Sequence, residues 1–508
     1  MTSPRSHVVL LAVASLVGLV AVIVAFRQAA PAPAPEPPAV EAPATGESPR
    51  ADPKATYRPT VLPDRVILTF AGDPATSQAV TWRTDPSVRG PLAEVAVATD
   101  GPAFEKGWHG YNEKAVKKLA ARTEKLAAGG YDALYHSVTF TGLAPKTKYV
   151  YRVGDGANWS EWFQFETASK EPEPFGFIYF GDAQNGIRSL WSRVARGAFS
   201  DMPKARFIVH AGDLVDSGNS DQQWGEWHAA AGWINGMVPS VPAVGNHEYS
   251  GPKGLTNHWR PQFTLPEHGP TGLHESCYFL DYQGVRLIVL NSNEKHAEQA
   301  KWLEVVLADN PNRWTVVTFH HPVYSPIKGR ENVTVREAWR KVIDAAPRGV
   351  DLVLQGHDHT YGRSGLMRED NTLTGTQVQT LRGTVYVVSV SGPKLYTGGD
   401  APWMVRRGNG VQLYQLVRVE DDELVYESRT ARGDLYDAFT LKKRPDGGND
   451  LIEGENPPGP EGPSVPDTIG AAGADGDRAG SRDGWNAAAA VVILALVALS
   501  IGWAVRGR

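Results

Sequence analysis

Residues 239–248 read Pro-Ser-Val-Pro-Ala-Val-Gly-Asn-His-Glu, a short apolar segment that leads directly into an amide, an imidazole and a carboxylate. A short apolar run bounded by turn residues is typical of a buried strand. Asn246, His247 and Glu248 would then lie in the loop that follows this strand. We therefore predict a strand over residues 239–244 with chemically active side chains beyond its carboxyl end.

The same arrangement recurs from residue 174 onward. Four more apolar strands lead into polar loops, and a further strand over residues 384–390 closes the set: residues 175–180 before Gly181-Asp182, 206–210 before Gly212-Asp213, 313–319 before His320-His321-Pro322, and 351–354 before Gly356-His357-Asp358-His359. Helical segments over residues 298–308 and 335–345 alternate with these strands, which is typical of an α/β domain. Ligands of open α/β sheets bind beyond the carboxyl ends of the strands, so we expect the loops to converge on one cleft.

The donor types in these loops indicate the chemistry. Two aspartates, one asparagine and three histidines form a mixed oxygen and nitrogen set, which favours zinc, iron or manganese over calcium. A carboxylate shared by two cations lets them approach to roughly 3.5–4 Å, where they can clamp one phosphate. The pattern therefore predicts a pair of metal ions and hydrolysis of phosphate esters.

A different pattern precedes this region. From Pro59 to about Ala168 we predict short strands separated by turn residues: residues 65–70, 78–83, 136–140, 149–153 and 161–167. Residues 141–154 resemble the corner and penultimate strand of a fibronectin type III sandwich. Residues 104–126 contain helix-forming runs without a long periodic face, and no element is predicted there.

The chain resembles the calcineurin-like metallophosphoesterases in the order and spacing of five motifs: Gly181-Asp182, Gly212-Asp213, Gly245-Asn246-His247-Glu248, His320-His321-Pro322-Val323-Tyr324 and Gly356-His357-Asp358-His359. The preceding β region, residues 278–290 with 299–303, and residues 360–364 narrow the resemblance to the purple acid phosphatase-like branch. The resemblance covers residues 59–443. It implies a four-layer α/β fold, a β-sandwich flanked by helices, preceded by an all-β fibronectin III-like sandwich.

The resemblance also implies which residues act. It gives six metal ligands, of which one is shared: Asp182 and His359 on the first ion, Asn246, His320 and His357 on the second, and Asp213 between them. It places His247 beside the phosphate, as a general acid or as a donor to the charge of the transition state. The cofactors it implies are two divalent or trivalent metal ions, iron, zinc or manganese.

Departures from the family pattern leave some roles open. Asp216 stands where the purple branch has a tyrosine, three residues after the bridging aspartate, so the purple colour of a tyrosine phenolate on ferric iron should be absent. Gln184 either completes the shell of the first metal or lines the pocket, and Asp216 either binds metal or does not. Tyr324, at the end of the His320 motif, and Lys328 and Arg330, in the loop after it, are candidate substrate-binding residues; the two cations could bind phosphate.

Two uniformly apolar runs predict the location. Residues 8–26 and 487–505 are each long enough to span a bilayer as a helix, although a buried core helix is the alternative. Arg506 and Arg508 predict a cytoplasmic tail, which places the region between the runs outside the cytoplasmic membrane. We expect seven segments: a signal peptide or anchor (1–27), a Pro/Ala-rich linker (28–58), the fibronectin III-like domain (59–170), the catalytic domain (171–443), a Gly/Pro/Asp-rich linker (444–486), a transmembrane helix (487–505) and a tail (506–508).

Composition limits the partners. The 508 residues carry 51 basic and 56 acidic side chains, and a net charge of −5 gives no reason to expect nucleic acid. The single cysteine, Cys277, excludes internal disulfides. We expect a membrane-tethered, extracytoplasmic phosphomonoesterase that uses a hydroxide bridging the metals. Two alternatives remain, a phosphodiesterase with the same site and a non-catalytic surface binding protein, and the sequence predicts no oligomeric state.

Overall fold

The computed structural model describes residues 51–250, 254–368 and 383–454, and from Pro53 onward they belong to one compact unit. Both apolar runs predicted from the sequence, residues 8–26 and 487–505, lie outside the described residues. Within the described part, no helix combines the length and the apolar composition that crossing a membrane requires.

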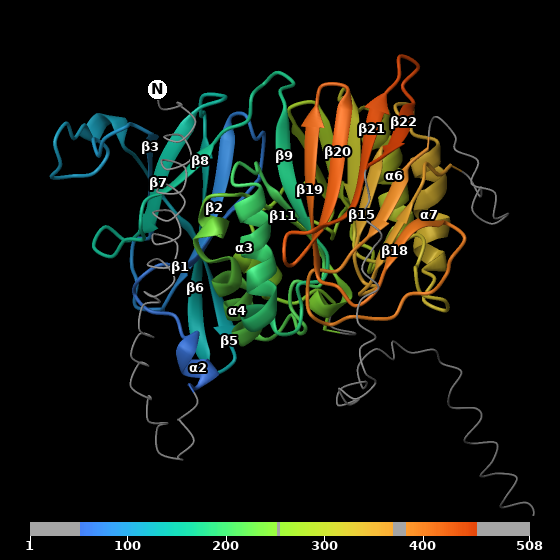
Figure 1. Ribbon diagram of the computed structural model, residues 1–508. Coiled ribbons are helices and arrows are strands. Elements are labelled where there is room, and N and C mark those ends of the chain that lie inside the picture. The colour runs from blue at the N-terminus through green and yellow to red at the C-terminus, as the bar shows by residue number, and fades with distance from the viewer. Residues whose placement is uncertain (1–50, 251–253, 369–382, 455–508) are drawn as a thin grey trace, which may run out of the picture. The chain divides into compact units, whose positions relative to one another are not determined.

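Eleven strands of the described chain form the larger sheet, in the order β22 (Asn449–Glu453), β21 (Leu435–Lys443), β20 (Glu423–Thr430), β19 (Leu413–Glu420), β9 (Phe175–Phe180), β10 (Ile208–Ala211), β11 (Ser240–Ala243), β1 (Asp64–Thr69), β2 (Ser77–Thr84), β6 (Tyr131–Thr141) and β5 (Arg122–Ala128) (Figure 1). Its centre is the parallel set β9, β10 and β11, in which Ile208 lies opposite both Ile178 and Ser240. β19 continues the sheet antiparallel to β9.

A second sheet has seven strands in the described residues, in the order β12 (Tyr278–Tyr282), β13 (Val285–Val289), β14 (Trp314–Thr318), β15 (Leu352–Gln355), β17 (Val385–Val388), β16 (Tyr361–Ser364) and β18 (Met404–Gly408). The strands β13, β14, β15 and β17 run parallel to one another. A third sheet has the order β4 (Lys117–Ala120), β3 (Leu92–Val97), β7 (Lys148–Gly154) and β8 (Phe163–Glu166).

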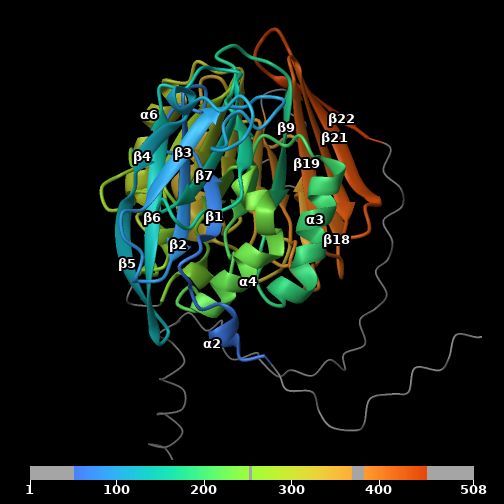
Figure 2. The ribbon, with the colours of Figure 1, turned by 90° about the vertical axis from the view of Figure 1, so that its left-hand side faces the viewer.

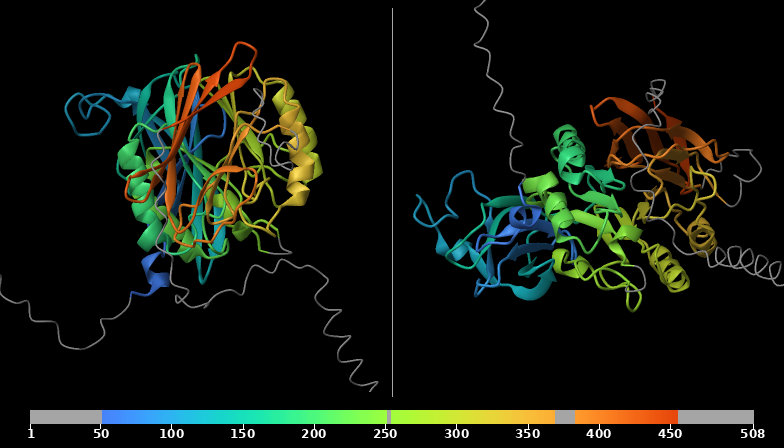
Figure 3. Two further views of the ribbon diagram at one scale, coloured as in Figure 1. Left: turned by 45° about the vertical axis from the view of Figure 1, so that its right-hand side comes forward. Right: turned by 90° about the horizontal axis from the view of Figure 1, so that it is seen from below.

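The helices lie on the two outer faces of the catalytic region: α3 (Ser192–Asp201) and α4 (Asp221–Ala231) on one side, α6 (His296–Ala308) and α7 (Val333–Asp344) on the other (Figure 3). Short helical segments complete the described elements: α2 (Pro53–Thr56), η1 (Glu113–Ala115), η2 (Ile187–Trp191), η3 (Gly232–Gly236), η4 (Asn246–Glu248) and α5 (Trp259–Gln262).

Alternation along β13 shows how the layers pack. Leu287 belongs to the apolar core that the two large sheets share, whereas Ile288 belongs to the core beneath α6 and α7. Successive side chains of a strand point to opposite faces, so β13 is buried on both sides and is apolar apart from Arg286. The result is helix, sheet, sheet and helix in sequence, and the predicted α/β fold with an N-terminal β region is confirmed.

The N-terminal β region, residues 59–170, has two sheets packed on each other, and one of them is joined to the catalytic sheet. Its strands β1, β2, β6 and β5 lie side by side (Figure 2). They extend the catalytic sheet, because β1 pairs in parallel with β11 through Thr69 and Ser240. Only β3, β4, β7 and β8 form a sheet of their own, packed on the first through Trp82, Phe140 and Tyr151. Residues 104–126, left unassigned from the sequence, contain η1 and β4 and the start of β5.

The ends of the two predicted linkers also differ from the expected positions. β22 pairs with β21 along its length, so residues 449–453 belong to the folded region and not to the linker predicted from residue 444. Residues 53–56 form α2 at the end of the predicted Pro/Ala-rich linker. Lys443 explains part of the first change, because its ammonium and Asn449 both bond the buried carboxylate of Asp351.

A buried ion pair joins the N-terminal strands to the helical layer. Asp221, the first residue of α4, accepts from Arg65 of β1 at 2.8 Å and from Arg83 of β2 at 3.0 Å. Tyr131 donates its hydroxyl to the same carboxylate at 2.5 Å. The side chains of Arg65 and Asp221 are each 3% exposed, so the guanidinium groups depend on this carboxylate for compensation of their charge.

Asp221→Asn should therefore lower the free energy of unfolding by about 3–5 kcal/mol, because breaking one side of a buried ion pair leaves charge uncompensated. Urea unfolding of the purified protein measures this change. Asp434→Asn is the matched control, since Asp434 pairs with Arg432 at a surface where both side chains are more than half exposed. The control should lose less than about 1 kcal/mol. Equal losses in the two variants would contradict the assignment.

His210, in β10, is enclosed by aromatic rings. Ring centroids of Phe180 and Trp227 lie 5.8 and 5.3 Å from the imidazole. Burial lowers the pKa of His210 to about 3. The unfolded chain has an ordinary histidine pKa of about 6.5, so it binds this proton more tightly than the folded protein does. The stability contributed by neutral His210 is present above pH 6.5 and is lost as the pH falls toward 3.

His210→Phe should reduce the acid sensitivity of the fold. Each pH unit below about 6.5 costs the wild type about 1.36 kcal/mol through this group. Between pH 7.5 and 5.0 the variant should lose about 2 kcal/mol less unfolding free energy than the wild type. Urea titrations of both proteins at the two pH values, in the presence of a metal chelator, test this. The same loss of unfolding free energy in the wild type and the variant would contradict it.

Candidate metal centre

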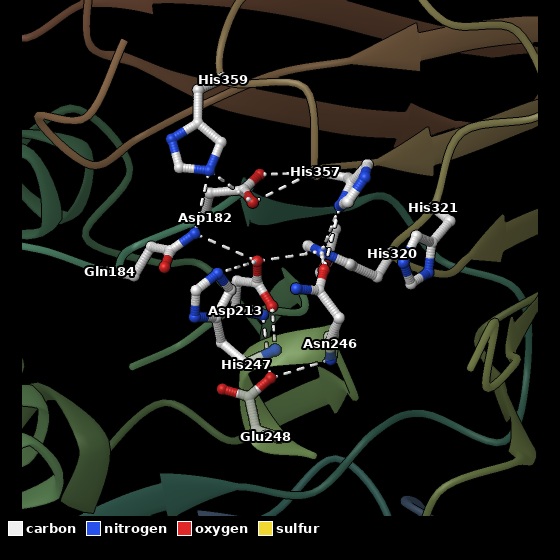
Figure 4. A network of polar contacts seen from close by, with 12 residues as sticks. Asp182, Gln184, Asp213, Asn246, His247, Glu248, His320, His321, His357 and His359 are labelled. Carbon is white, nitrogen blue, oxygen red and sulfur yellow. Dashed lines mark hydrogen bonds and ion pairs between the residues drawn. The ribbon is translucent and has the colours of Figure 1, made fainter. Parts of the chain in front are cut away.

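Polar residues that follow five strands meet at one end of the two large sheets (Figure 4). The larger sheet supplies Asp182 after β9, Asp213 after β10 and Asn246 after β11; the smaller supplies His320 after β14, and His357 and His359 after β15. Within each sheet these strands are parallel, so their carboxyl ends lie at the same edge. The structure thus brings together all six ligands predicted from the sequence.

Glycines make this approach possible. A Cβ on Gly245 would lie 2.0 Å from Oδ1 of Asp213, and one on Gly356 would lie 2.4 Å from Oδ2 of Asp182. Neither position accepts a larger residue without displacing a carboxylate. Asp182, Asp213 and His357 have φ angles of 38°, 50° and 74°, a left-handed conformation that costs free energy in residues other than glycine. The surrounding fold holds these residues in place against that cost.

Four donor atoms of the second predicted set form a tight cluster. Nε2 of His320 lies 3.0 Å from Oδ2 of Asp213 and 3.0 Å from Oδ1 of Asn246. Nδ1 of His357 lies 3.0 Å from the same asparagine oxygen and 3.2 Å from Nε2 of His320. Ligand atoms about 2.0–2.2 Å from one zinc ion lie about 3.0–3.5 Å from one another. The donors present therefore fit a cation.

The first predicted set lies beside it. Asp182, Asp213 and His359 each offer one ligand atom within 4.8 Å of the others, and Nε2 of His359 lies 3.5 Å from Oδ1 of Asp182. The amide of Gln184 lies between them, with Nε2 2.9 Å from Nε2 of His359 and 3.1 Å from Oδ2 of Asp213. Asp213 faces both sets, as a shared carboxylate must.

Backbone carbonyls orient the histidines. Nδ1 of His320 donates to the carbonyl of Ala211 at 2.8 Å, and Nδ1 of His359 donates to that of Lys394 at 2.8 Å. These bonds fix the proton on Nδ1 and leave the lone pair of Nε2 directed at the centre, as a metal ligand requires.

His321 lies beside the second set. It forms a close group with His320 and His357. Ser292 bonds its Nδ1 at 2.8 Å, and burial lowers the pKa of His321 to about 3. The neutral ring packs 4.4 Å from that of His357, so it supports this ligand from the side.

Burial and mutual charge set the protonation of the centre. Burial raises the pKa of Asp182 well above its ordinary value. Burial acts on Asp213 in the same direction, but the adjacent His320 holds the pKa of Asp213 well below its usual range. Burial opposes the charge of His320, whereas the Asp213 carboxylate raises the pKa of His320 to about 9. A cation must displace these protons, so metal binding should weaken in acid.

His247 is held as a proton-transferring group would be. Its Nδ1 donates to the backbone carbonyl of Asp216 at 2.6 Å, and its Nε2 lies 3.9 Å from Oδ2 of Asp213. The side chain is 18% exposed, so the ring borders both the centre and solvent. The carboxylate of Asp216 lies 3.8 Å from Nδ1.

Glu248 has a structural role that we did not predict, although it is part of the motif Gly245-Asn246-His247-Glu248. Its fully buried carboxylate accepts from the backbone N–H groups of Gly245 at 2.8 Å, Leu214 at 2.9 Å and Asp213 at 3.0 Å. It thus ties the loop that carries Asp213 to the loop that carries Asn246. The sequence signal that could have indicated this role is the position of Glu248, directly after the apolar strand and the predicted site residues Asn246 and His247.

The three candidate substrate-binding residues lie in different surroundings, and one of them, Arg330, contacts the centre. Tyr324 is 6% exposed and packs in the core beneath the helices, whereas Lys328 is exposed. Arg330 reaches the centre: its Nε donates to Asp358 at 2.6 Å and a terminal nitrogen lies 2.9 Å from Nε2 of His357. Its guanidinium also lies over the ring of Tyr396, at 5.3 Å, and Lys394 lies 5.7 Å from that ring; neither was singled out from the sequence.

Comparison with known proteins shows the family of this chain. Residues 63–167 match the family model of the purple acid phosphatase N-terminal domain, and residues 176–361 match that of the calcineurin-like phosphoesterases. An uncharacterized Mycobacterium tuberculosis protein is 26% identical over 374 residues, covering 63% of this chain and 68% of that one. Acid phosphatase type 7 of Danio rerio is 27% identical over 366 residues, covering 62% and 80%.

A solved structure shares the fold. The purple acid phosphatase PPD1 of yellow lupin superposes with a TM-score of 0.63 at 19% identity, covering 76% of this chain and 75% of that one. The two family matches follow one another along the chain and together span more than half of it. The chain is therefore a calcineurin-like metallophosphoesterase of the purple acid phosphatase-like branch, a hydrolase of phosphoric ester bonds.

Proposed function

We propose that this hydrolase is a phosphomonoesterase that depends on two metal ions and is tethered to a membrane with its site outside the cytoplasm. The observation that carries the catalytic part is the pair of adjacent donor sets that share Asp213, with ligand atoms about 3 Å apart. The names of the relatives, acid phosphatase and purple acid phosphatase, support the reaction class.

Different residues of the chain would bind the cations, transfer the proton and bind the phosphoryl group. Cations at the two sets would supply Lewis acidity and activate a water for attack on phosphorus. His247, whose Nδ1 proton is fixed by the Asp216 carbonyl, can carry a second proton on Nε2 and deliver it to the leaving oxygen. Arg330, anchored by Asp358, is close enough to the second set to donate to phosphoryl oxygens.

Charge at the rim favours a monoester. A phosphate monoester is a dianion at neutral pH, whereas a diester carries one charge and a second ester arm. Arg330 and Lys394 both lie beside Tyr396, whose ring stacks 4.6 Å from that of His359. Two cationic side chains close to the metal ligands would stabilise the additional negative charge.

The assay that tests this function compares a chromogenic monoester with a chromogenic diester on purified full-length protein, together with metal analysis. We expect two metal ions per chain and a higher kcat/KM for the monoester, with Asp213→Asn as the inactive control. A preference for the diester would assign the site to a phosphodiesterase. Metal-free, inert wild-type protein would favour the surface binding protein.

The proposed location rests on the two uniformly apolar runs and on Arg506 and Arg508 beside the second of them. A charged, membrane-impermeant monoester tests it in intact and lysed cells that produce the protein. Equal activities would support a site outside the cytoplasm. Activity that emerges only on lysis would contradict it.

A further inference from the structure

Gln184 combines two features that its surroundings do not explain. Its side chain is fully buried between Asp213 and His359, and its Nε2 donates to both. Its Oε1 is also buried and has no hydrogen-bond partner among the described residues. A buried polar atom without a partner costs free energy. The amide thus directs its donor at the centre and leaves its acceptor unsatisfied.

Rotation of the amide by 180° exchanges these two atoms. Oε1 would then lie about where Nε2 is now, 2.9 Å from Nε2 of His359 and 3.1 Å from Oδ2 of Asp213. The lone pairs of these three atoms would then face one another. They would repel one another unless a cation lay between them, and all three would coordinate that cation. The separations match the 3.0–3.2 Å between donor atoms of the second set.

We infer that Gln184 is a neutral oxygen ligand of the first cation, together with Asp182, Asp213 and His359, and that metal binding turns its amide from donor to acceptor. This inference rests on the proposed metal-dependent function. In the present orientation the lone pairs of His359 and Asp213 accept from the amide N–H groups. The cation replaces them and gives the orphaned oxygen a partner.

The donor set also indicates the class of metal. Asp182 and the shared Asp213 are the anionic ligands, whereas His359 and Gln184 are neutral. Asp216 is not part of this set: its carboxylate lies 3.8 Å from Nδ1 of His247, whose Nε2 lies 3.9 Å from Asp213. With this little negative charge, the first position suits a divalent cation such as Zn²⁺, Mn²⁺ or Fe²⁺ better than a trivalent one.

The test measures metal binding and not turnover. Full-length protein is stripped with a chelator and titrated with Zn²⁺ and with Mn²⁺ by calorimetry, and bound metal is counted after dialysis. Gln184→Met keeps the size of the side chain and removes the ligand. With either metal, we expect one of the two ions bound per chain to bind at least about 10-fold more weakly than in the wild type. Replacing even a residue that lies behind a ligand lowers metal affinity about 10–100-fold. Gln184→Glu retains an oxygen there and should bind both ions at least as tightly as the wild type.

Gln415→Met is the matched control. Gln415, in β19, is likewise fully buried with an unpartnered Oε1, but its Nε2 donates to Ser389 and Ser428 and not to a metal ligand. It should bind both ions with wild-type affinity. Wild-type binding of both ions by Gln184→Met would overturn the inference and leave the proposed function intact. A wild type that binds no metal would overturn the proposed function and the inference with it. If Gln184→Met does not fold, Gln184→Asn, whose oxygen is one methylene short, gives the same readout.

Discussion

Alanine at Asp213 should lower kcat/KM for a phosphate monoester by at least about 10³-fold, because metal ions contribute several kcal/mol to the transition state and 1.36 kcal/mol is a factor of ten. Oδ2 of Asp213 is 3.0 Å from His320 in the second set and 3.1 Å from Gln184 in the first, so both ions lose the same ligand. Metal analysis should show one ion or none per chain.

Two controls separate this effect from misfolding. Asp213 also accepts from the backbone N–H of His247 through Oδ1, at 2.9 Å, so its removal loosens the loop of Asn246. Circular dichroism and urea unfolding in a chelator report that structural part, and Asp213→Asn keeps the volume and an acceptor oxygen. Asp213→Ala protein that retains two ions and wild-type turnover would exclude the shared carboxylate.

Alanine at His247 should reduce kcat by about 10²- to 10⁴-fold, the usual contribution of a positioned proton donor. No metal should be lost, since Nε2 of His247 lies 3.9 Å from Asp213 and the ring is anchored to the Asp216 carbonyl rather than to the donor sets. Steady-state kinetics and metal analysis on the same preparation provide the two readouts.

The leaving group distinguishes proton delivery from other roles of His247. A nitrophenolate leaves without protonation, whereas an alkoxide needs a proton, so the loss should be larger for an alkyl phosphate than for a nitrophenyl phosphate. Equal losses would assign His247 to charge stabilisation instead. Loss of metal would make it a structural residue, and full turnover would remove it from the mechanism.

The sequence predicted which residues come together at the centre because that information is local. Each ligand follows an apolar strand directly, and strands of one direction place such residues at one edge of a sheet whatever the intervening chain does. Gly245 and Gly356 were part of the same motifs, and the structure shows that a side chain at either would meet a carboxylate.

Long-range contacts account for what was missed. The pairing of Thr69 with Ser240, which makes one sheet of two predicted domains, involves residues far apart in the chain and has no local pattern. The role of Glu248 depends on backbone N–H groups of another loop. Tyr324 was expected near substrate because of its motif, but its ring packs against those of Tyr386 and Trp403 in the core.

The continuous sheet has a consequence for how the molecule can be divided. Deleting residues 59–170 would remove β1 and leave β11, the strand that leads to Asn246, at an open edge of the sheet. Exposed edges of this kind recruit strands from other molecules. The N-terminal region is therefore not an independent folding unit that can be removed or exchanged. Any shortened version of this enzyme should begin upstream of Asp64.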